Sequence, residues 1–310
     1  MNTTERHMSD ITVGWIGIGN MGWPMARNAK QAGVDIAVFD LDQDKLGRFA
    51  DEFDAKRAPS LAALSEMSDV IVTIVPDGKV VRKICFGDGD NLAAGFAAGK
   101  ILVDMSSSAP MGTRALGDEL HAKGVTLIDA PVSGGVVGAD KATLSIMVGC
   151  SDEAALAKVM PTFEATGKNI FRCGPLGAGH AMKCLNNYLS AVGLTATNEA
   201  LLIGQKFGLD PATMVDILNV STGRNSSTER KYHQSVLPRT YNSGFATALM
   251  AKDVGIAAGL AGDQDMFAPL LHELNEIWTK YNEVMPEANH EATIEYLEKM
   301  NATRLKGPKA

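Results

Sequence analysis

Several features that mark particular protein classes are absent from this chain of 310 residues. Cysteine is rare, and no CxxC or zinc-finger spacing occurs, which excludes a disulfide-built domain and indicates no metal site. No stretch approaches the roughly 18 apolar residues of a membrane span, and the polar start MNTTERHMSD lacks the apolar core of a secretory signal. We therefore expect reduced core thiols in a cytoplasmic protein. The cysteines are Cys85, Cys150, Cys173 and Cys184.

An excess of positive charge is also absent, since 29 Lys and Arg residues against 36 Asp and Glu residues give a net charge of −7. Such a chain has no general attraction for nucleic acid or for an anionic membrane, so we expect neither as a partner. A local basic pocket for a small anionic ligand is compatible with this balance.

The first half of the chain alternates short apolar runs with helical patterns. Strand-like runs occupy 11–19, 34–40, 69–76 and 100–106, and further strand signals continue to about residue 173. Helical patterns cover 21–32 and 110–122. Alternating strands and helices predict a doubly wound α/β domain with a parallel sheet and right-handed crossovers.

From Pro175 onward the pattern is almost entirely helical. Gly and Pro interrupt the chain at CGPLGAG, just before the first long helical pattern. We predict a first domain over 10–173 and an all-helical domain over 174–310. The helical patterns of the second domain cover 178–206, 211–219, 246–262 and 268–284.

The segment GIGNMG follows the first predicted strand and precedes the first predicted helix. In the G-x-G-x-x-G pattern, Gly17 allows a tight turn, Gly19 lets the backbone approach a pyrophosphate, and Gly22 allows close helix–strand packing. The backbone N–H groups at the helix start then bind the anion. The sequence predicts a Rossmann dinucleotide-binding turn formed by Gly17, Ile18, Gly19, Asn20, Met21 and Gly22.

Asp40 ends the second predicted strand, at AVFD. A carboxylate there accepts hydrogen bonds from both ribose hydroxyls, whereas a 2′-phosphate would meet like charge. We therefore favour NAD as cofactor, with NADP as the alternative. The competing interpretation of Asp40 is a helix cap, for which Asp42 is the better candidate.

Two further segments carry side chains suited to a substrate. In DAPVSGG, Ser133 is followed by Gly134 and Gly135, which offer a hydroxyl and bare N–H groups to a carboxylate, although a plain turn has the same composition. In GAGHAMKCLNN, Lys183 and Asn187 share one helix face, with Asn186 beside them. The lysine is either a solvated residue or a general acid or base.

Lys252 and Asp253 lie inside an apolar run, LMAKDVGIA. By itself such a pair is usually the surface turn of an amphipathic helix.

Four long segments, taken in order, resemble the β-hydroxyacid dehydrogenase family. They are GWIGIGNMGWPMARN, DAPVSGGVVGADKATLSIMVG, GPLGAGHAMKCLNN and FATALMAKD, and the resemblance spans roughly residues 11 to 300. The resemblance implies a Rossmann domain followed by an all-helical domain, and dimers or tetramers formed through the helical part.

The resemblance also implies residue roles. Lys183 matches the catalytic lysine and Asn187 the asparagine that holds the substrate, while Ser133, Gly134 and Gly135 match the carboxylate-binding loop. Lys252 and Asp253 match a pair that closes over substrate and nicotinamide. The positions that match cofactor contacts are Val75, Pro76 and Val80, at and after the IVPD segment, and Ser107, in MSSS.

Two departures from the family pattern stand out. Ala142 occupies a position where many relatives have glycine. The segment STGRNSSTERKY, residues 221–232, differs from that of 3-hydroxyisobutyrate dehydrogenases, and it places Arg224, Asn225 or Ser226 against the substrate or forms a solvated loop. The identity of the substrate depends on this segment.

The expected function is NAD-dependent interconversion of a small β-hydroxy acid and its semialdehyde, with Lys183 as general acid or base. The expected partners are the small anionic hydroxy acid and further copies of the chain, as a homodimer or homotetramer. A reductase of another aldehyde acid, such as tartronate or a sulfonated semialdehyde, is the alternative within the class. Less favoured are a 6-phosphogluconate dehydrogenase, an imine reductase and a non-catalytic NAD-binding scaffold.

Overall fold

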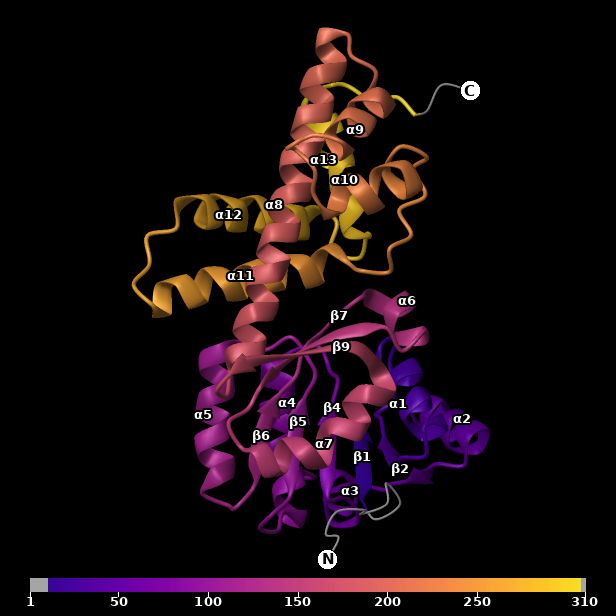
Figure 1. Ribbon diagram of the computed structural model, residues 1–310, viewed down its shortest axis with the longest axis vertical. Helices are drawn as coiled ribbons and strands as arrows, with labels where there is room; N and C mark the ends of the chain where they lie inside the picture. Colours follow the sequence, from indigo (N-terminus) through magenta and orange to yellow (C-terminus); the bar gives the residue numbers. More distant parts are fainter. Residues whose placement is uncertain (1–10, 308–310) are drawn as a thin grey trace, which may run out of the picture. The chain divides into compact units, whose positions relative to one another are not determined.

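The computed structural model describes residues 11–307 and divides the chain into two compact units. Unit 1 ends at Lys183 and unit 2 begins at Cys184. Helix α8 (Ala178–Phe207) is continuous through this boundary and belongs to both units (Figure 1).

Unit 1 is built on one sheet of nine strands (Figure 1). The strand order is β3-β2-β1-β4-β5-β6-β8-β7, with β9 paired to β8. The strands are β1 (Thr12–Ile16), β2 (Asp35–Phe39), β3 (Lys56–Arg57), β4 (Val70–Thr73), β5 (Ile101–Asp104), β6 (Thr126–Asp129), β7 (Val132–Ser133), β8 (Leu144–Gly149) and β9 (Gly167–Gly174).

Helices connect these strands. They are α1 (Gly22–Gln31), α2 (Gln43–Phe53), α3 (Leu61–Met67), α4 (Gly78–Phe86), the 3₁₀ helix η2 (Leu92–Gly95), α5 (Pro110–His121), α6 (Gly135–Asp140) and α7 (Glu153–Thr166). Local sequence starts several of them, because a side-chain oxygen at the N-cap satisfies a free backbone N–H. Asp42 caps α2, as predicted, by accepting from Lys45 N at 3.0 Å.

Both faces of the sheet are covered. In β1, Val13 and Trp15 belong to one hydrophobic cluster and Ile16 to the other, and β2 alternates in the same way. Because successive side chains of a strand point to opposite faces, these continuous apolar runs bury both sides. The doubly wound α/β prediction is thereby confirmed.

The prediction of a parallel sheet holds from β3 through β6 but is wrong at the far end. There β8 runs antiparallel to both β6 and β7, and only β9 is parallel to it. The link from β7 to β8 holds only α6 and a short loop, which is less chain than a parallel crossover needs.

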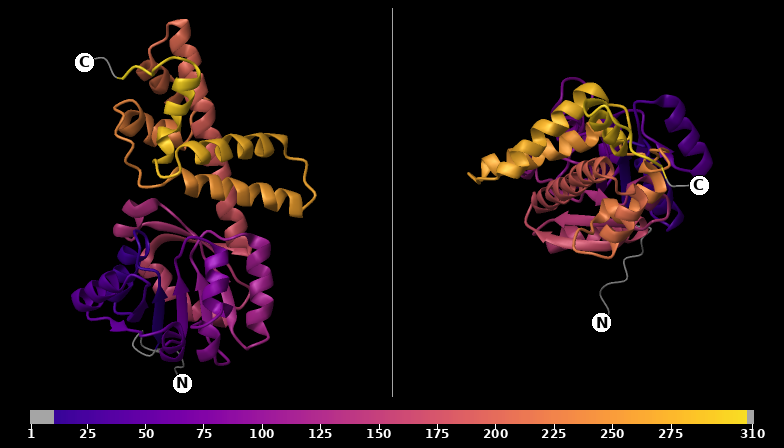
Figure 2. Two further views of the ribbon diagram at one scale, coloured as in Figure 1. Left: turned by 180° about the vertical axis from the view of Figure 1, so that it is seen from behind. Right: turned by 90° about the horizontal axis from the view of Figure 1, so that it is seen from above.

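Unit 2 is all helical. After α8 it contains α9 (Pro211–Asn219), α10 (Ser226–Arg230), the π-helix η3 (Tyr232–Val236), α11 (Thr247–Asp263), α12 (Pro269–Val284), the 3₁₀ helix η4 (His290–Ala292) and α13 (Thr293–Met300). Helices α11 and α12 lie side by side as a hairpin (Figure 2). Their apolar sides join those of α8 in one core that includes Leu194, Val254 and Trp278.

All four cysteines are unpaired. Three are buried, but Cys173 is only half-buried, so the prediction of core thiols is wrong for that residue. Strand β9, at the margin of the sheet, carries Cys173. Within residues 11–307, no helix is long and apolar enough to cross a membrane, and no cluster of three potential metal ligands occurs.

Candidate active site

The glycine-rich turn between β1 and α1 fits a dinucleotide. Gly17 has a φ of 90°, which favours glycine, and a Cβ there would collide with the carbonyl oxygen of Ile74. A Cβ at Gly22 would collide with the carbonyl oxygen of Gly17, so helix and turn can approach only with glycine. A Cβ at Gly19 would meet nothing within 4 Å, which leaves that backbone open to a ligand. These are the three roles that a pyrophosphate-binding turn requires.

Asp40 lies beside this turn at the end of β2. Its Oδ2 accepts from Ile18 N at 2.8 Å and its Oδ1 from Asp42 N at 2.9 Å. Each carboxylate oxygen has two acceptor sites, so one on each remains for a ribose hydroxyl. The carboxylate therefore also fixes the turn, a role that the sequence analysis did not anticipate.

The segment after β4 presents the other expected cofactor contacts. Val75 and Val80 are half-buried and Pro76 is exposed. Val75 N donates to Ser106 Oγ at 3.0 Å, and Ser107 follows as a half-buried residue. This hydrogen bond holds the end of β4 against the segment that leaves β5.

The predicted carboxylate loop has the backbone that its glycines suggest. Gly134 has a φ of 136° and Gly135 a φ of 61°, so both occupy conformations that side chains rarely adopt. Both glycines are exposed and Ser133 is half-buried. Further along, Ala142 has a φ of 53°, a left-handed conformation that glycine would adopt with less strain.

The first turn of α8 is fastened to the sheet by Asp129, the last residue of β6. Asp129 Oδ1 accepts from Gly177 N and Oδ2 from His180 N, both at 2.7 Å. A carboxylate at a helix N-terminus satisfies free N–H groups and complements the helix dipole. Burial raises the pKa of Asp129, while His180 and the two backbone N–H groups oppose that rise.

The ring of His180 continues this buried network. Its Nδ1 lies 2.8 Å from Thr113 Oγ1, and its Nε2 lies 3.6 Å from Asp104 Oδ2. Asp104 accepts from Ser106 N at 2.9 Å, and Ser106 in turn holds Val75. One set of contacts therefore connects the segment after β4 with the start of α8.

Lys183 follows one turn later on α8, and only 9% of its surface is exposed. A solvated surface lysine is thereby ruled out for this position. Asn187, one turn further and 6% exposed, lies on the same face of the helix.

In unit 2 the predicted residues of α8 and α11 form a chain of contacts. Asn186 Nδ2 donates to Asn187 Oδ1 at 3.2 Å, and Asn187 Nδ2 donates to Asp253 Oδ2 at 2.5 Å. Lys252 Nζ lies 3.5 Å from Asp253 Oδ1. Asp253 is 2% exposed, so this pair is not the solvated surface turn that the sequence allowed.

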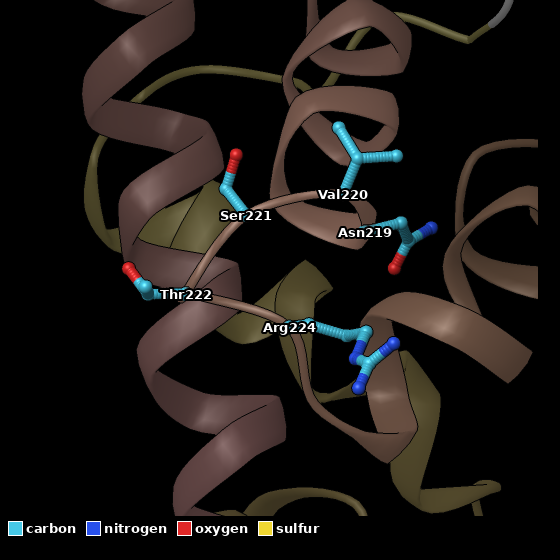
Figure 3. A pocket seen from close by; sticks show the side chains of 5 residues that line it. All are labelled: Asn219, Val220, Ser221, Thr222 and Arg224. Carbon is cyan, nitrogen blue, oxygen red and sulfur yellow. The ribbon is translucent and has the colours of Figure 1, made fainter.

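The segment 221–232 divides into residues with different surroundings. Arg224 is exposed, lies 3.5 Å from Glu229, and lines a cavity of about 480 Å³ together with Asn219, Val220, Ser221 and Thr222. The side chains of Asn219 and Arg224 extend to the same side of this loop (Figure 3).

Asn225 has a structural role that the sequence analysis did not assign. Its Oδ1 accepts from Ser227 N and Thr228 N, which caps α10. Its Nδ2 donates to Thr197 Oγ1 and to the carbonyl oxygen of Gly223. These bonds use the full capacity of an amide side chain, so a substrate would have to break the cap to bind Asn225.

Comparison with known proteins assigns the chain to a family. Residues 12–174 match the family described as the NAD binding domain of 6-phosphogluconate dehydrogenase. Residues 177–297 match the family described as NAD-binding of NADP-dependent 3-hydroxyisobutyrate dehydrogenase.

Curated relatives extend along most of the chain. A 2-(hydroxymethyl)glutarate dehydrogenase of Eubacterium barkeri is 38% identical over 82% of this chain and 84% of its own length. A 3-hydroxyisobutyrate dehydrogenase of Pseudomonas aeruginosa is 39% identical over 85% of this chain and 89% of its own. The chain belongs to the β-hydroxyacid dehydrogenase family.

A solved structure agrees with this assignment. The Mycobacterium tuberculosis 3-hydroxyisobutyrate dehydrogenase, solved with L-serine, is 32% identical, covers 93% of this chain and 99% of its own, and superposes with a TM-score of 0.84. As a β-hydroxyacid dehydrogenase, the protein is an oxidoreductase that uses NAD or NADP and acts on a CH–OH group.

Asp104, Asp129 and His180 are not among the site residues that the sequence of this dehydrogenase predicted. A signal was present, because Asp104 and Asp129 each end an apolar strand and lie side by side in the β5–β6 pair. Polar residues at the carboxyl ends of parallel strands face the ligand-binding edge of such sheets. The partner His180 could not be found in this way, since it comes from a helix 51 residues after Asp129.

Proposed function

We propose that this dehydrogenase interconverts a small β-hydroxy acid and its semialdehyde, with Lys183 as the general acid or base. The observation that carries the proposal is a buried lysine one turn before a buried asparagine on α8. Relatives named for 3-hydroxyisobutyrate and 2-(hydroxymethyl)glutarate support the substrate class.

In the oxidation, the amine of Lys183 accepts the proton of the substrate hydroxyl. Bound NAD would supply the acceptor for the hydride of the carbon that carries this hydroxyl. Asn187 orients the hydroxyl through its amide, and Asp253 fixes that amide by accepting its N–H. Ser133, Gly134 and Gly135 hold the substrate carboxylate. Reduction of the semialdehyde runs the same proton transfer in reverse.

The cofactor assignment favours NAD. Gly17, Gly19 and Gly22 shape the pyrophosphate turn, and Asp40 accepts from the ribose hydroxyls with the acceptor sites that remain on its oxygens. The further proposed cofactor contacts are Val75, Pro76, Val80 and Ser107 of unit 1, and the family resemblance adds Lys252 of unit 2.

Lys183→Ala is the direct test. General acid–base groups contribute about 10²–10⁴ in rate, so we expect turnover of the best short β-hydroxy acid to fall by roughly that factor. Affinity for NADH, measured by fluorescence, should stay within about twofold. Lys206→Ala removes an exposed lysine of the same helix and should change neither quantity.

Two results would contradict the proposal. Turnover of Lys183→Ala near the wild-type rate would remove the lysine from the chemistry. Binding of NAD with no turnover across 3-hydroxyisobutyrate, D-glycerate, L-serine, threonate and 3-hydroxypropionate would favour the scaffold alternative.

We further propose a homodimer or homotetramer formed through unit 2, in the cytoplasm. Large apolar side chains stay exposed on α8 in pairs one turn apart, which is unusual for a monomer surface. They are Leu185 with Leu189, and Ile203 with Phe207. Light scattering of the purified chain gives the mass directly, and a monomer at micromolar concentration would contradict this assembly.

A further inference from the structure

A second lysine of unit 2, Lys231, has surroundings that neither the family motifs nor the proposed chemistry uses. Its Nζ lies 2.8 Å from His290 Nε2. Lys231 is half-buried, and His290 is 4% exposed. The two residues are 59 positions apart, so the fold brings them together.

The ring of His290 is oriented by the backbone. Its Nδ1 lies 3.0 Å from the carbonyl oxygen of Phe245. Since a carbonyl only accepts, Nδ1 carries the proton and Nε2 presents a lone pair to the amine. Lys231 therefore donates to a neutral imidazole.

Nothing else in the described structure satisfies this amine. His290 is its one hydrogen-bond partner within residues 11–307, and no carboxylate there lies within 4 Å of it. Glu291 acts on it only at longer range, and Glu291 Oε2 accepts from Ser243 N at 3.2 Å. Burial lowers the pKa of Lys231 to about 8 and that of His290 to about 3.

A half-buried amine with one neutral partner is costly as a structural element. An apolar side chain of similar length would fill the same space without the cost of removing a charge from water. Two of its three N–H groups lack a partner in the part of the chain described. That arrangement suits an amine whose anionic partner is a ligand.

The position within unit 2 relates this amine to Asn187 and Asp253. Phe245, which holds His290, directly precedes α11, and the second turn of α11 carries Lys252 and Asp253. Helix α11 begins at Thr247, so the rise per residue of a helix separates Thr247 from Asp253 by about 9 Å along the axis, and Phe245 lies two residues before Thr247. A substrate that reaches this amine has to extend from the Asn187–Asp253 pair toward this end of α11.

We propose that Lys231, oriented by His290, binds a second anionic group at the far end of the substrate, so that the enzyme selects β-hydroxy acids that carry two anions. The inference rests on the proposed function and narrows its substrate class. Carboxylate, sulfonate and phosphonate groups share the required chemistry, because each offers two or more acceptor oxygens to a cationic donor.

The first experiment compares matched substrates. We would measure kcat/KM for 2-(hydroxymethyl)glutarate, which has two carboxylates, and for 2-(hydroxymethyl)pentanoate, which replaces the distal carboxylate by a methyl group. The wild type should prefer the dianion by at least about tenfold. Lys231→Met should abolish that preference through KM of the dianion, with kcat/KM for the monoanion changed less than about twofold. Sulfonate and phosphonate analogues identify the preferred anion.

Three control variants separate binding from folding. Lys231→Arg keeps a cation and should retain part of the preference. His290→Gln keeps an acceptor but loses the fixed ring, so the preference should decrease without disappearing. Lys206→Met removes one exposed positive charge and should leave the preference unchanged.

An equilibrium measurement distinguishes this inference from the proposed function. Calorimetric titration of the NAD-loaded protein with glutarate and with butyrate requires no turnover. If glutarate binds more tightly than butyrate and Lys231→Met removes this difference, the inference is supported. It stays supported even if no hydroxy acid is turned over, because that result would contradict only the proposed function. Two results would overturn the inference. One is equal affinity of wild type and Lys231→Met for glutarate, and the other is an equal loss of affinity for glutarate and butyrate in Lys231→Met.

Discussion

The two units each bury a histidine beside charged residues, but they satisfy these groups to different extents. In unit 1, Asp129 and Asp104 accept hydrogen bonds from backbone N–H groups and hydroxyls on both of their oxygens. Within residues 184–307 of unit 2, the only hydrogen-bond partner of Lys231 Nζ is the imidazole of His290. Carboxylates engaged on both oxygens fix a backbone, although His180 Nε2 beside them has no hydrogen-bond partner in the described structure, whereas an amine with unused N–H groups keeps capacity for a ligand.

The buried groups of the two units also differ in the direction of their pKa shifts. Burial raises the pKa of Asp129 in unit 1 and lowers the pKa values of Lys231 and His290 in unit 2. In each case burial disfavours the charged form. The consequences for stability therefore have opposite signs, since one group is an acid and the others are bases.

The largest expected effect comes from removing the carboxylate that holds the start of α8, with Asp129→Asn. An amide can accept only one of the two backbone N–H groups and presents its own N–H to the other, so α8 loses its anchor three residues before Lys183. We expect a cost of about 2–4 kcal/mol and a melting temperature lower by roughly 5–10 °C. Turnover should fall at least about tenfold, mainly in kcat.

Asp90→Asn is the matched control for that variant. Asp90 also accepts from two backbone N–H groups at a helix start, Leu61 N at 2.7 Å and Ala62 N at 3.1 Å. Its exposed position predicts a cost of about 1 kcal/mol or less and unchanged turnover. Calorimetry measures the stability of each variant, and hydrogen exchange over residues 177–183 measures how well the start of α8 is held. Equal effects of the two variants would contradict the role of Asp129 as the anchor of α8.

An intermediate effect is expected from acidification. The pKa of His290 is about 3 in the folded chain and 6.5 in the unfolded chain. Between these two pH values, His290 therefore binds a proton only in the unfolded chain. The contribution of His290 to stability is therefore complete above pH 6.5 and decreases as the pH falls toward 3, by an amount on the order of 3–5 kcal/mol. Asp129, whose pKa is raised, contributes stability that is greatest below its unfolded value of 3.8 and is lost as the pH rises.

Hydrogen exchange measured from pH 7 to pH 4 gives the protection of backbone amides in each unit separately. Peptides around η4 and α11 should lose protection before those of the β5–β6 strands. His290→Gln should flatten this dependence, whereas His233→Gln, which alters a histidine paired with Asp216 at 2.8 Å on the surface, should not. Equal loss of protection in both units would contradict the prediction.

The smallest effect concerns the cofactor. Asp40→Asn removes the charge that opposes a 2′-phosphate and keeps an acceptor for Ile18 N, and the exposed Asp42 N that loses its acceptor can bond to water. We expect the preference for NAD over NADP, as a ratio of kcat/KM, to fall about tenfold with little change in melting temperature. A ratio that stays constant would show that the ribose is recognised elsewhere.

Much of the fold follows from local patterns. Continuous apolar runs predict strands buried on both faces, and helices α1, α5, α8, α9, α11 and α12 begin and end within one residue or so of their sequence patterns. The glycines of the first turn could also be assigned in advance, because the steric need at Gly17 and Gly22 belongs to the turn itself.

Other features depend on contacts between distant segments. The antiparallel end of the sheet, the reassignment of Asn225 to a helix cap, the His180 network and the Lys231–His290 pair could not be predicted in this way. Each joins residues whose approach is decided by how helices and strands pack, and none leaves a periodic signal in the chain.

The sequence by itself determined the family, the order of strands and helices, and which side chains are suited to bind a dinucleotide or move a proton. The tertiary structure alone decided which of those side chains are buried, which are used up by the backbone, and which keep a hydrogen-bonding position for a ligand. The physical reason is that residue type sets what a group can do, whereas burial and partners, which come from folding, set whether that capacity remains.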